Sequence, residues 1–103
     1  WFTDCPPCRS EIPQIVDFHD ANPGIPVIGI SIDRIPTPHL RSRSGQLGID
    51  YTVLHDRGGA VARSYGVTVF PTTMIVSGGE IRSVRVGEID RAMLTSMVER
   101  NGG

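Results

Sequence analysis

The sequence predicts an α/β fold in which a mixed central sheet is flanked by helices, and three observations support this prediction. Segments of helical periodicity alternate with apolar runs that are typical of strands. The run Val27–Ile32 is continuously apolar rather than alternating, as in the strands of a covered sheet. Ser77-Gly78-Gly79-Glu80 separates two further apolar runs and indicates a hairpin. A helix that joins two neighbouring strands of one sheet gives an α/β layer.

The first helix is predicted to begin at Cys5-Pro6-Pro7-Cys8. Each proline biases the residue before it away from the helical region, and Pro7 suits the first helical position, where no N–H is needed. A stripe at helical spacing follows, made of Cys8, Ile12, Ile15, Val16 and His19. We therefore expect Cys8 on the buried face and Cys5 at the helix tip, nearer water. Pro13 bends this helix, and Asn22-Pro23-Gly24 ends it.

The middle of the chain alternates between extended and helical patterns. Val27–Ile32 is the first predicted strand. Thr37-Pro38 is a cap and first-turn signal for a weak helix that ends near Gly48. A short extended segment covers residues 51–54. Asp56 then caps a helix of one to two turns that is closed by Gly66.

The C-terminal part is predicted to be a hairpin followed by a helix. Its strands run over residues 72–76 and 81–86. The last helix starts at Ile89-Asp90, and Ile89 and Leu94 are placed as a hydrophobic staple. Its core stripe consists of Leu94, Met97 and Val98.

Length and composition indicate a single globular domain over residues 1–103, with 39% hydrophobic and 20% charged residues. A net charge of −1 gives no reason to expect a nucleic-acid or anionic-membrane partner. The sequence shows no signal peptide and no spanning segment. Trp1 lies four residues before Cys5 with no apolar strand ahead of it. We expect that the strand before the dithiol helix, with any signal or anchor, is missing from this chain.

The two cysteines allow three interpretations: a redox pair, half of a zinc site, or a structural bridge. A structural zinc site needs four ligands, but there is no second cysteine pair. His19, His39 and His55 also lie too far apart in sequence to form a two-histidine clip. A bridge across so short a loop adds little stability, because the entropic gain grows with loop length. The pattern favours redox chemistry over a metal-binding or purely structural use.

Three separated motifs together resemble the thioredoxin superfamily. Trp1-x-x-x-Cys5-Pro6-Pro7-Cys8-Arg9 is similar to its redox loop. Pro13 falls where that family bends its first helix. Phe70-Pro71-Thr72-Thr73, just before a hairpin strand, resembles the cis-proline loop that faces the dithiol.

The most similar branch is the extracytoplasmic TlpA/ResA type, which includes thiol oxidoreductases of cytochrome c maturation. Two further segments are similar to the sequence pattern of this branch: Cys8-Arg9-x-Glu11-x-Pro13, and Asp56-x-Gly58-Gly59-x-Val61-Ala62-x-x-Tyr65-Gly66-Val67. The sequence departs from the wider family where Asp4 replaces an aromatic residue and where Pro-Pro replaces Gly-Pro.

The resemblance implies a thioredoxin-like thiol–disulfide oxidoreductase that needs no cofactor and no metal. It implies protein thiol or disulfide substrates, with apocytochrome c as a candidate, and re-reduction by a membrane electron donor. It further implies a reductant that works outside the cytoplasm, in the periplasm or cell envelope. An oxidant or isomerase of the same fold is the nearest alternative. A copper metallochaperone using the cysteine pair is another, although no histidine is obviously positioned to close on the pair.

The candidate catalytic residues are Cys5 and Cys8. A helix N-terminus lowers the pKa of a thiol, so Cys5 is expected to attack and Cys8 to resolve the mixed disulfide. The stabilisation is modest, because the two prolines supply no N–H and Asp4 adds negative charge.

Four further residues have candidate roles, and that of Pro71 follows from the resemblance. Pro71 is a candidate cis-proline that positions substrate, Phe70 is a core or rim residue beside it, and Trp1 is a candidate wall of the site. Glu11 has two open roles, a surface charge or an aid to proton movement near Cys8. His19, which lies on the buried stripe, is expected to be a hydrogen-bonded core histidine.

Overall fold

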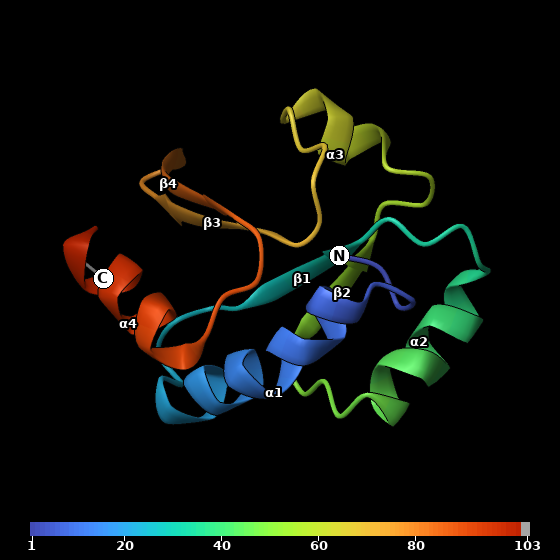
Figure 1. Ribbon diagram of the computed structural model, residues 1–103, viewed down its shortest axis with the longest axis horizontal. Coiled ribbons are helices and arrows are strands. Elements are labelled where there is room, and N and C mark those ends of the chain that lie inside the picture. Colours follow the sequence, from blue (N-terminus) through green and yellow to red (C-terminus); the bar gives the residue numbers. More distant parts are fainter. Residues whose placement is uncertain (102–103) are drawn as a thin grey trace.

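A computed structural model describes residues 1–101, and its helices and strands follow the predicted order (Figure 1). In the view of Figure 1, α1 lies below β1 and β2, α4 lies at the left below the β3–β4 hairpin, and α3 lies at the top. The elements are α1 (Pro6–Ala21), β1 (Ile28–Ser31), α2 (Thr37–Gln46), β2 (Thr52–His55), α3 (Ala60–Ser64), β3 (Thr72–Ser77), β4 (Glu80–Val86) and α4 (Arg91–Arg100).

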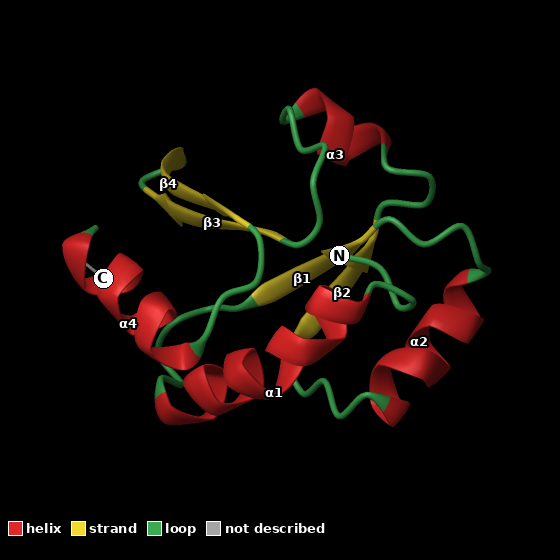
Figure 2. Ribbon diagram, in the orientation of Figure 1, coloured by secondary structure: helices red, strands yellow, loops and turns green. Residues whose placement is uncertain are grey.

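The strands form two separate pairs (Figure 2). β1 and β2 are parallel, with Ile28 opposite Thr52, and β3 and β4 are antiparallel, with Thr72 opposite Val86. The predicted mixed sheet is therefore present as a parallel pair and an antiparallel pair, and within residues 1–101 β1 is not hydrogen-bonded to β3. Two hydrogen bonds join the backbone of Trp1 to β1 and the residue after it. The Trp1 amine donates to the Ile30 carbonyl (3.1 Å), and the Trp1 carbonyl accepts from Ile32 N–H (3.0 Å).

The core lies between α1, α4 and β3. It is built around Phe18 of α1 and the side chains that begin and line α4, namely Ile89, Leu94, Met97 and Val98. Ile75 of β3 packs against this cluster. The predicted core stripe of α4 is confirmed. Asp90 caps the helix by accepting a hydrogen bond from Met93 N–H at 2.8 Å.

The prediction that β1 is covered on both faces is wrong. Ile28 and Ile30 are 54% and 43% exposed, whereas Ser31 is fully buried. The strand therefore alternates, and its packed face carries the small residues. A Cβ at Gly29 would meet the Tyr51 ring at 3.0 Å and the Trp1 indole nitrogen at 3.2 Å. Two aromatic rings fill the space over this face, so only a small residue fits beneath them.

The helix after β2 starts later than Asp56. Gly59 precedes it in the left-handed region (φ 81°) and is its N-cap residue. Asp56 still satisfies two backbone donors at the helix start, Val61 N–H at 3.1 Å and Ala62 N–H at 2.9 Å. These hydrogen bonds lower the pKa of Asp56.

Candidate active site

The two cysteines form a disulfide at the N-terminus of α1, with their Cα atoms 5.2 Å apart. Cys5 is the N-cap residue in an extended conformation (φ −87°, ψ 108°), and the helix begins at Pro6, one residue earlier than predicted. The Sγ atom of Cys5 accepts a hydrogen bond from Cys8 N–H at 3.3 Å. Pro6 and Pro7 have no N–H, so the backbone N–H of Cys8 is the first hydrogen-bond donor of the helix.

The expected difference in exposure between the cysteines is wrong, because Cys5 is 3% exposed and Cys8 is 1% exposed. The reason is tertiary: a loop distant in sequence lies against Cys5. The Phe70 carbonyl oxygen is 3.9 Å from Cys5 Sγ. The ring of Phe70 also packs edge-on against that of Phe2, with centroids 5.9 Å apart.

The peptide bond between Phe70 and Pro71 is cis, as predicted. Pro71 is fully buried and lies in the loop that contacts the disulfide. Its carbonyl accepts from Gly87 N–H at 2.8 Å, which ties the loop to the end of β4. Thr72 donates its hydroxyl to the Val69 carbonyl at 2.6 Å, closing the turn around the proline. The hairpin therefore presents this loop to the disulfide.

Glu11 lies one helical turn beyond Cys8 and is 5% exposed, so the surface-charge role left open above is wrong. Its carboxylate accepts a hydrogen bond from Ile89 N–H at 3.1 Å. Burial raises the pKa of Glu11 from 4.5 to about 7, in spite of this hydrogen bond, which favours the charged form. Such a carboxyl group can hold or release a proton near neutral pH.

The Trp1 side chain packs toward β1 and Tyr51, as the short approach to Gly29 shows. Its indole nitrogen is buried and has no hydrogen-bond partner. None of these contacts reaches the disulfide, so a role for Trp1 at the rim of the site stays a prediction.

A polar network before Cys5 was missed by the sequence analysis. Thr3 is 2% exposed and contacts Asp33 and Arg43, which follow it by 30 and 40 residues. No local pattern marks such a network, because its members come from separate elements. Thr3 and Asp33 lie next to the ends of predicted elements, but Arg43 lies inside a predicted helix and carries no such signal.

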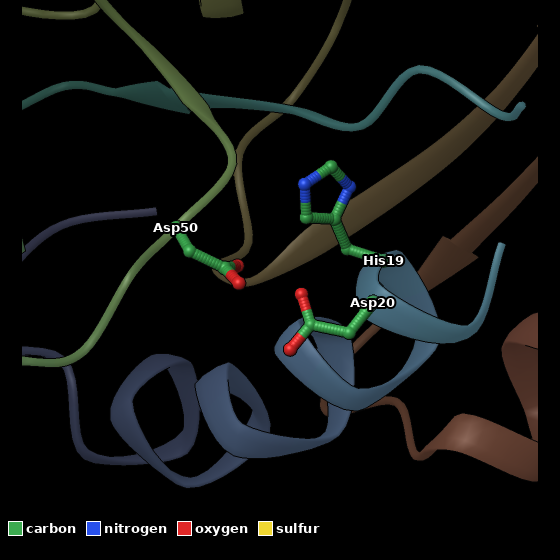
Figure 3. A group of neighbouring side chains, drawn as sticks. All are labelled: His19, Asp20 and Asp50. Atoms are coloured by element: carbon green, nitrogen blue, oxygen red, sulfur yellow. The ribbon is translucent and has the colours of Figure 1, made fainter. Parts of the chain in front are cut away.

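A second polar group lies at the other end of α1 (Figure 3). Ligand atoms of His19, Asp20 and Asp50 are within 4.8 Å of one another, and Figure 3 shows the two carboxylates facing each other. A side-chain hydrogen bond to Asp50 raises the pKa of Asp20. Among residues 1–101 this is the group with metal-ligand spacing, and it includes neither cysteine.

The expectation of a hydrogen-bonded His19 is wrong. Its Nδ1 atom is buried and has no hydrogen-bond partner. The ring is only partly buried and packs edge-on against Tyr51, with centroids 6.2 Å apart.

A disulfide at the start of a helix, faced by a cis-proline loop within an α/β frame, defines the thioredoxin-like class of protein. The match of residues 1–99 to the Redoxin family model agrees with this, and the chain belongs to the Redoxin family.

Relatives and solved structures support the same class. The chain is 26% identical to the thiol-disulfide oxidoreductase ResA of Halalkalibacterium halodurans and 24% identical to the sporulation thiol-disulfide oxidoreductase A of Bacillus subtilis. Each match covers 96% of this chain, which spans 57% and 63% of those relatives. A structure assigned as the thiol:disulfide interchange protein DsbE of Chlorobium tepidum superposes with a TM-score of 0.88 at 25% identity, covering 100% of this chain and 76% of that one.

The predicted thioredoxin-like fold and the resemblance to ResA-type thiol–disulfide oxidoreductases are confirmed by these matches.

Proposed function

We propose that this chain exchanges disulfides with protein partners through Cys5 and Cys8. The observation that carries the proposal is the disulfide at the start of α1, whose Cys5 sulfur accepts a helix N–H and lies 3.9 Å from the Phe70 carbonyl. The partial positive charge of a helix N-terminus stabilises a thiolate at this position.

In the reducing direction, the Cys5 thiolate attacks one sulfur of a substrate disulfide. A bond forms between Cys5 and that sulfur, the substrate disulfide breaks, and the other substrate sulfur leaves as a thiolate. Cys8 then attacks Cys5 Sγ, which restores the Cys5–Cys8 disulfide and releases the second substrate thiolate. Two electrons pass from the dithiol to the substrate, and the released thiolates take up protons.

Glu11 supplies the proton acceptor in this scheme. Cys8 must lose its thiol proton before it can attack, and it is 1% exposed, so water has little access to it. Glu11 is one turn away on the same helix, and its pKa of about 7 makes it an effective acceptor at neutral pH. The pH profile of mixed-disulfide resolution should therefore contain a step near pH 7 that Glu11→Gln removes.

Substrate positioning is assigned to Phe70 and Pro71, with Trp1 retained as a candidate rim residue. The Phe70–Pro71 loop lies against Cys5, where the substrate sulfur must approach. A substrate segment bound along this loop would have its disulfide held beside Cys5, and such orientation is what accelerates the exchange.

The direction and place of the reaction complete the proposal. We assign a reducing role outside the cytoplasm, with apocytochrome c as a candidate substrate and a membrane electron donor that restores the dithiol. The support is the similarity to ResA and to the sporulation oxidoreductase. No helix within residues 1–101 is long and apolar enough to cross a membrane.

The test is a measurement of activity and of reduction potential on the same protein. We expect the reduced chain to reduce insulin disulfides, and Cys5→Ser to abolish this. Equilibration with glutathione should give a potential near the roughly −270 mV of thioredoxin. A potential near the roughly −120 mV of DsbA would overturn the reducing role in favour of an oxidant. An inactive wild-type dithiol would overturn the proposal itself.

A further inference from the structure

We propose that Arg43, on α2, is a positioning residue for the redox reaction: it holds the turn before Cys5 through Thr3 and compensates the charge of Asp4. The inference rests on the proposed role of Cys5 as the attacking thiol. It gives the helix between β1 and β2 a part in a reaction that takes place at the start of α1.

The turn that delivers Cys5 is held from one side by β1. Cys5 N–H donates to the Phe2 carbonyl at 3.2 Å, which closes the turn. Inside it, Thr3 donates its backbone N–H to both carboxylate oxygens of Asp33, at 3.2 and 3.1 Å, and its hydroxyl to Oδ1 at 2.7 Å. Asp33 is held in turn by the hydroxyl of Ser31, which is fully buried. The carboxylate is thus a fixed anchor for the turn.

Arg43 holds the same turn from the other side. Its Nη1 donates to the Thr3 hydroxyl at 3.0 Å, and its Nη2 donates to Asp4 Oδ1 at 3.1 Å. The Thr3 hydroxyl therefore accepts from Arg43 while it donates to Asp33. One buried residue, Thr3, links a cation on α2 to an anion two residues after β1, and the two terminal nitrogens of the guanidinium contact the consecutive residues Thr3 and Asp4. A planar guanidinium suits this pair of contacts better than an ammonium group, because its two terminal nitrogens can donate to two different residues at once.

The contact with Asp4 has a chemical consequence at Cys5. Asp4 is the residue directly before the attacking cysteine, and its negative charge opposes the formation of a thiolate there. Arg43 offsets this charge. The pair is partly exposed, with side-chain exposures of 42% and 72%, so the effect is limited by solvent. The other charged groups around the turn are Asp33, the Trp1 amine that interacts with it, Arg9 directly after Cys8 and, one turn beyond Cys8, Glu11.

A purely structural network would stabilise the fold without changing the acidity of Cys5. The pKa of the Cys5 thiol, taken from the pH dependence of its alkylation in the reduced full chain, separates the two cases. Arg43→Gln should lower the acid dissociation constant of Cys5 about threefold, as expected for the loss of one partly exposed ion pair. Arg41→Gln is the matched control, because Arg41 lies on the same helix and is exposed. It should leave the constant unchanged.

The response to Asp4 is the sharper measurement. Because the charges of Arg43 and Asp4 act on Cys5 independently, Asp4→Asn should raise the dissociation constant about threefold whether Arg43 is present or not, and in the Arg43→Gln background it should bring the constant back to near the wild-type value. Arg43→Lys keeps the charge but cannot contact Thr3 and Asp4 through two separate nitrogens, so its Cys5 dissociation constant should lie between those of wild type and Arg43→Gln. Urea unfolding of each variant identifies any loss of stability. If Arg43→Gln folds poorly, the Cys5 pKa of Asp4→Asn in the wild-type background tests whether the charge beside Cys5 controls its acidity.

Equal effects of Arg43→Gln and Arg41→Gln on the Cys5 pKa would overturn the inference, and so would an Asp4→Asn change that fails to restore the pKa in the Arg43→Gln background. These outcomes differ from failure of the proposed function, which would appear as a wild-type protein without disulfide exchange. The thiol pKa can be measured in either case, because alkylation needs no substrate.

Discussion

The Phe70 carbonyl oxygen lies 3.9 Å from the sulfur of Cys5, although the two residues are 65 positions apart in the sequence. From the other side, the same sulfur accepts the N–H of Cys8 at 3.3 Å. In the reduced protein, a Cys5 thiol would face an acceptor and a thiolate would keep a donor. Cys5 thus has groups near it that suit both protonation states, and the loop carrying Phe70 covers the site where a substrate must enter.

Cys5 is predicted to react before Cys8. The argument from exposure does not hold, since both cysteines are buried, so the prediction rests on the helix N–H that points at Cys5 Sγ. Limited alkylation at neutral pH, followed by mass spectrometry, should find the label on Cys5. Cys8→Ser should accumulate a mixed disulfide with substrate, and Cys5→Ser should not. First labelling at Cys8 would contradict the assignment.

Glu11 should make the stability of the folded protein depend on pH. Its pKa is raised from 4.5 to about 7 on folding, so between these values the folded state binds the proton more tightly than the unfolded state. The free energy of unfolding should therefore fall as the pH rises through this window and level off above it. With allowance for solvent screening, the contribution is up to about 2 kcal/mol.

Urea unfolding of the oxidised protein at pH 5 and pH 8 measures this effect. Glu11→Gln should remove that part of the pH dependence, because an amide does not titrate. Glu99→Gln, at an exposed position on α4, is the control. A wild-type pH dependence that Glu11→Gln leaves unaltered would show that the carboxyl group titrates equally in both states.

Phe70→Ala should uncover Cys5 and weaken the site. The change removes the edge-on contact with Phe2, whose centroid lies 5.9 Å away, and aromatic pairs of this kind contribute about 0.5–1.5 kcal/mol. We expect faster alkylation of Cys5 together with slower reduction of insulin. Val69→Ala, at a neighbouring position that is 51% exposed, serves as the control. Unchanged alkylation would mean that the Phe70 side chain does not shield the sulfur.

Gly29→Ala should destabilise the fold. The added Cβ would lie 3.0 Å from the Tyr51 ring and 3.2 Å from the Trp1 indole nitrogen, and overpacking of this kind costs about 1–3 kcal/mol. Gly24→Ala is the control, since nothing lies within 4 Å of its added Cβ. Denaturant midpoints for the two variants give the comparison. If both unfold at the same urea concentration, the rings move aside at little cost.

Local sequence patterns were enough to predict much of the fold. Helix α1 was predicted from two prolines at its start and a Pro-Gly stop, and the hairpin was predicted from two consecutive glycines, Gly78 and Gly79, both with positive φ. Helix α4 was predicted from its cap and its apolar stripe. These signals succeed because a cap or a turn depends on neighbouring residues alone. The extent of the domain stays a prediction.

The sequence by itself determined the redox pair, its place at a helix start and the proline loop as its candidate partner. The tertiary structure decided the rest. It buries Cys5 beneath the loop of Phe70, buries Glu11 where its pKa rises and so decides between the two roles that the sequence left open, and turns Ile28 outward. It also joins Arg43 to Thr3 across 40 positions. Burial and electrostatics depend on which distant segments pack together, and no spacing within one segment encodes that.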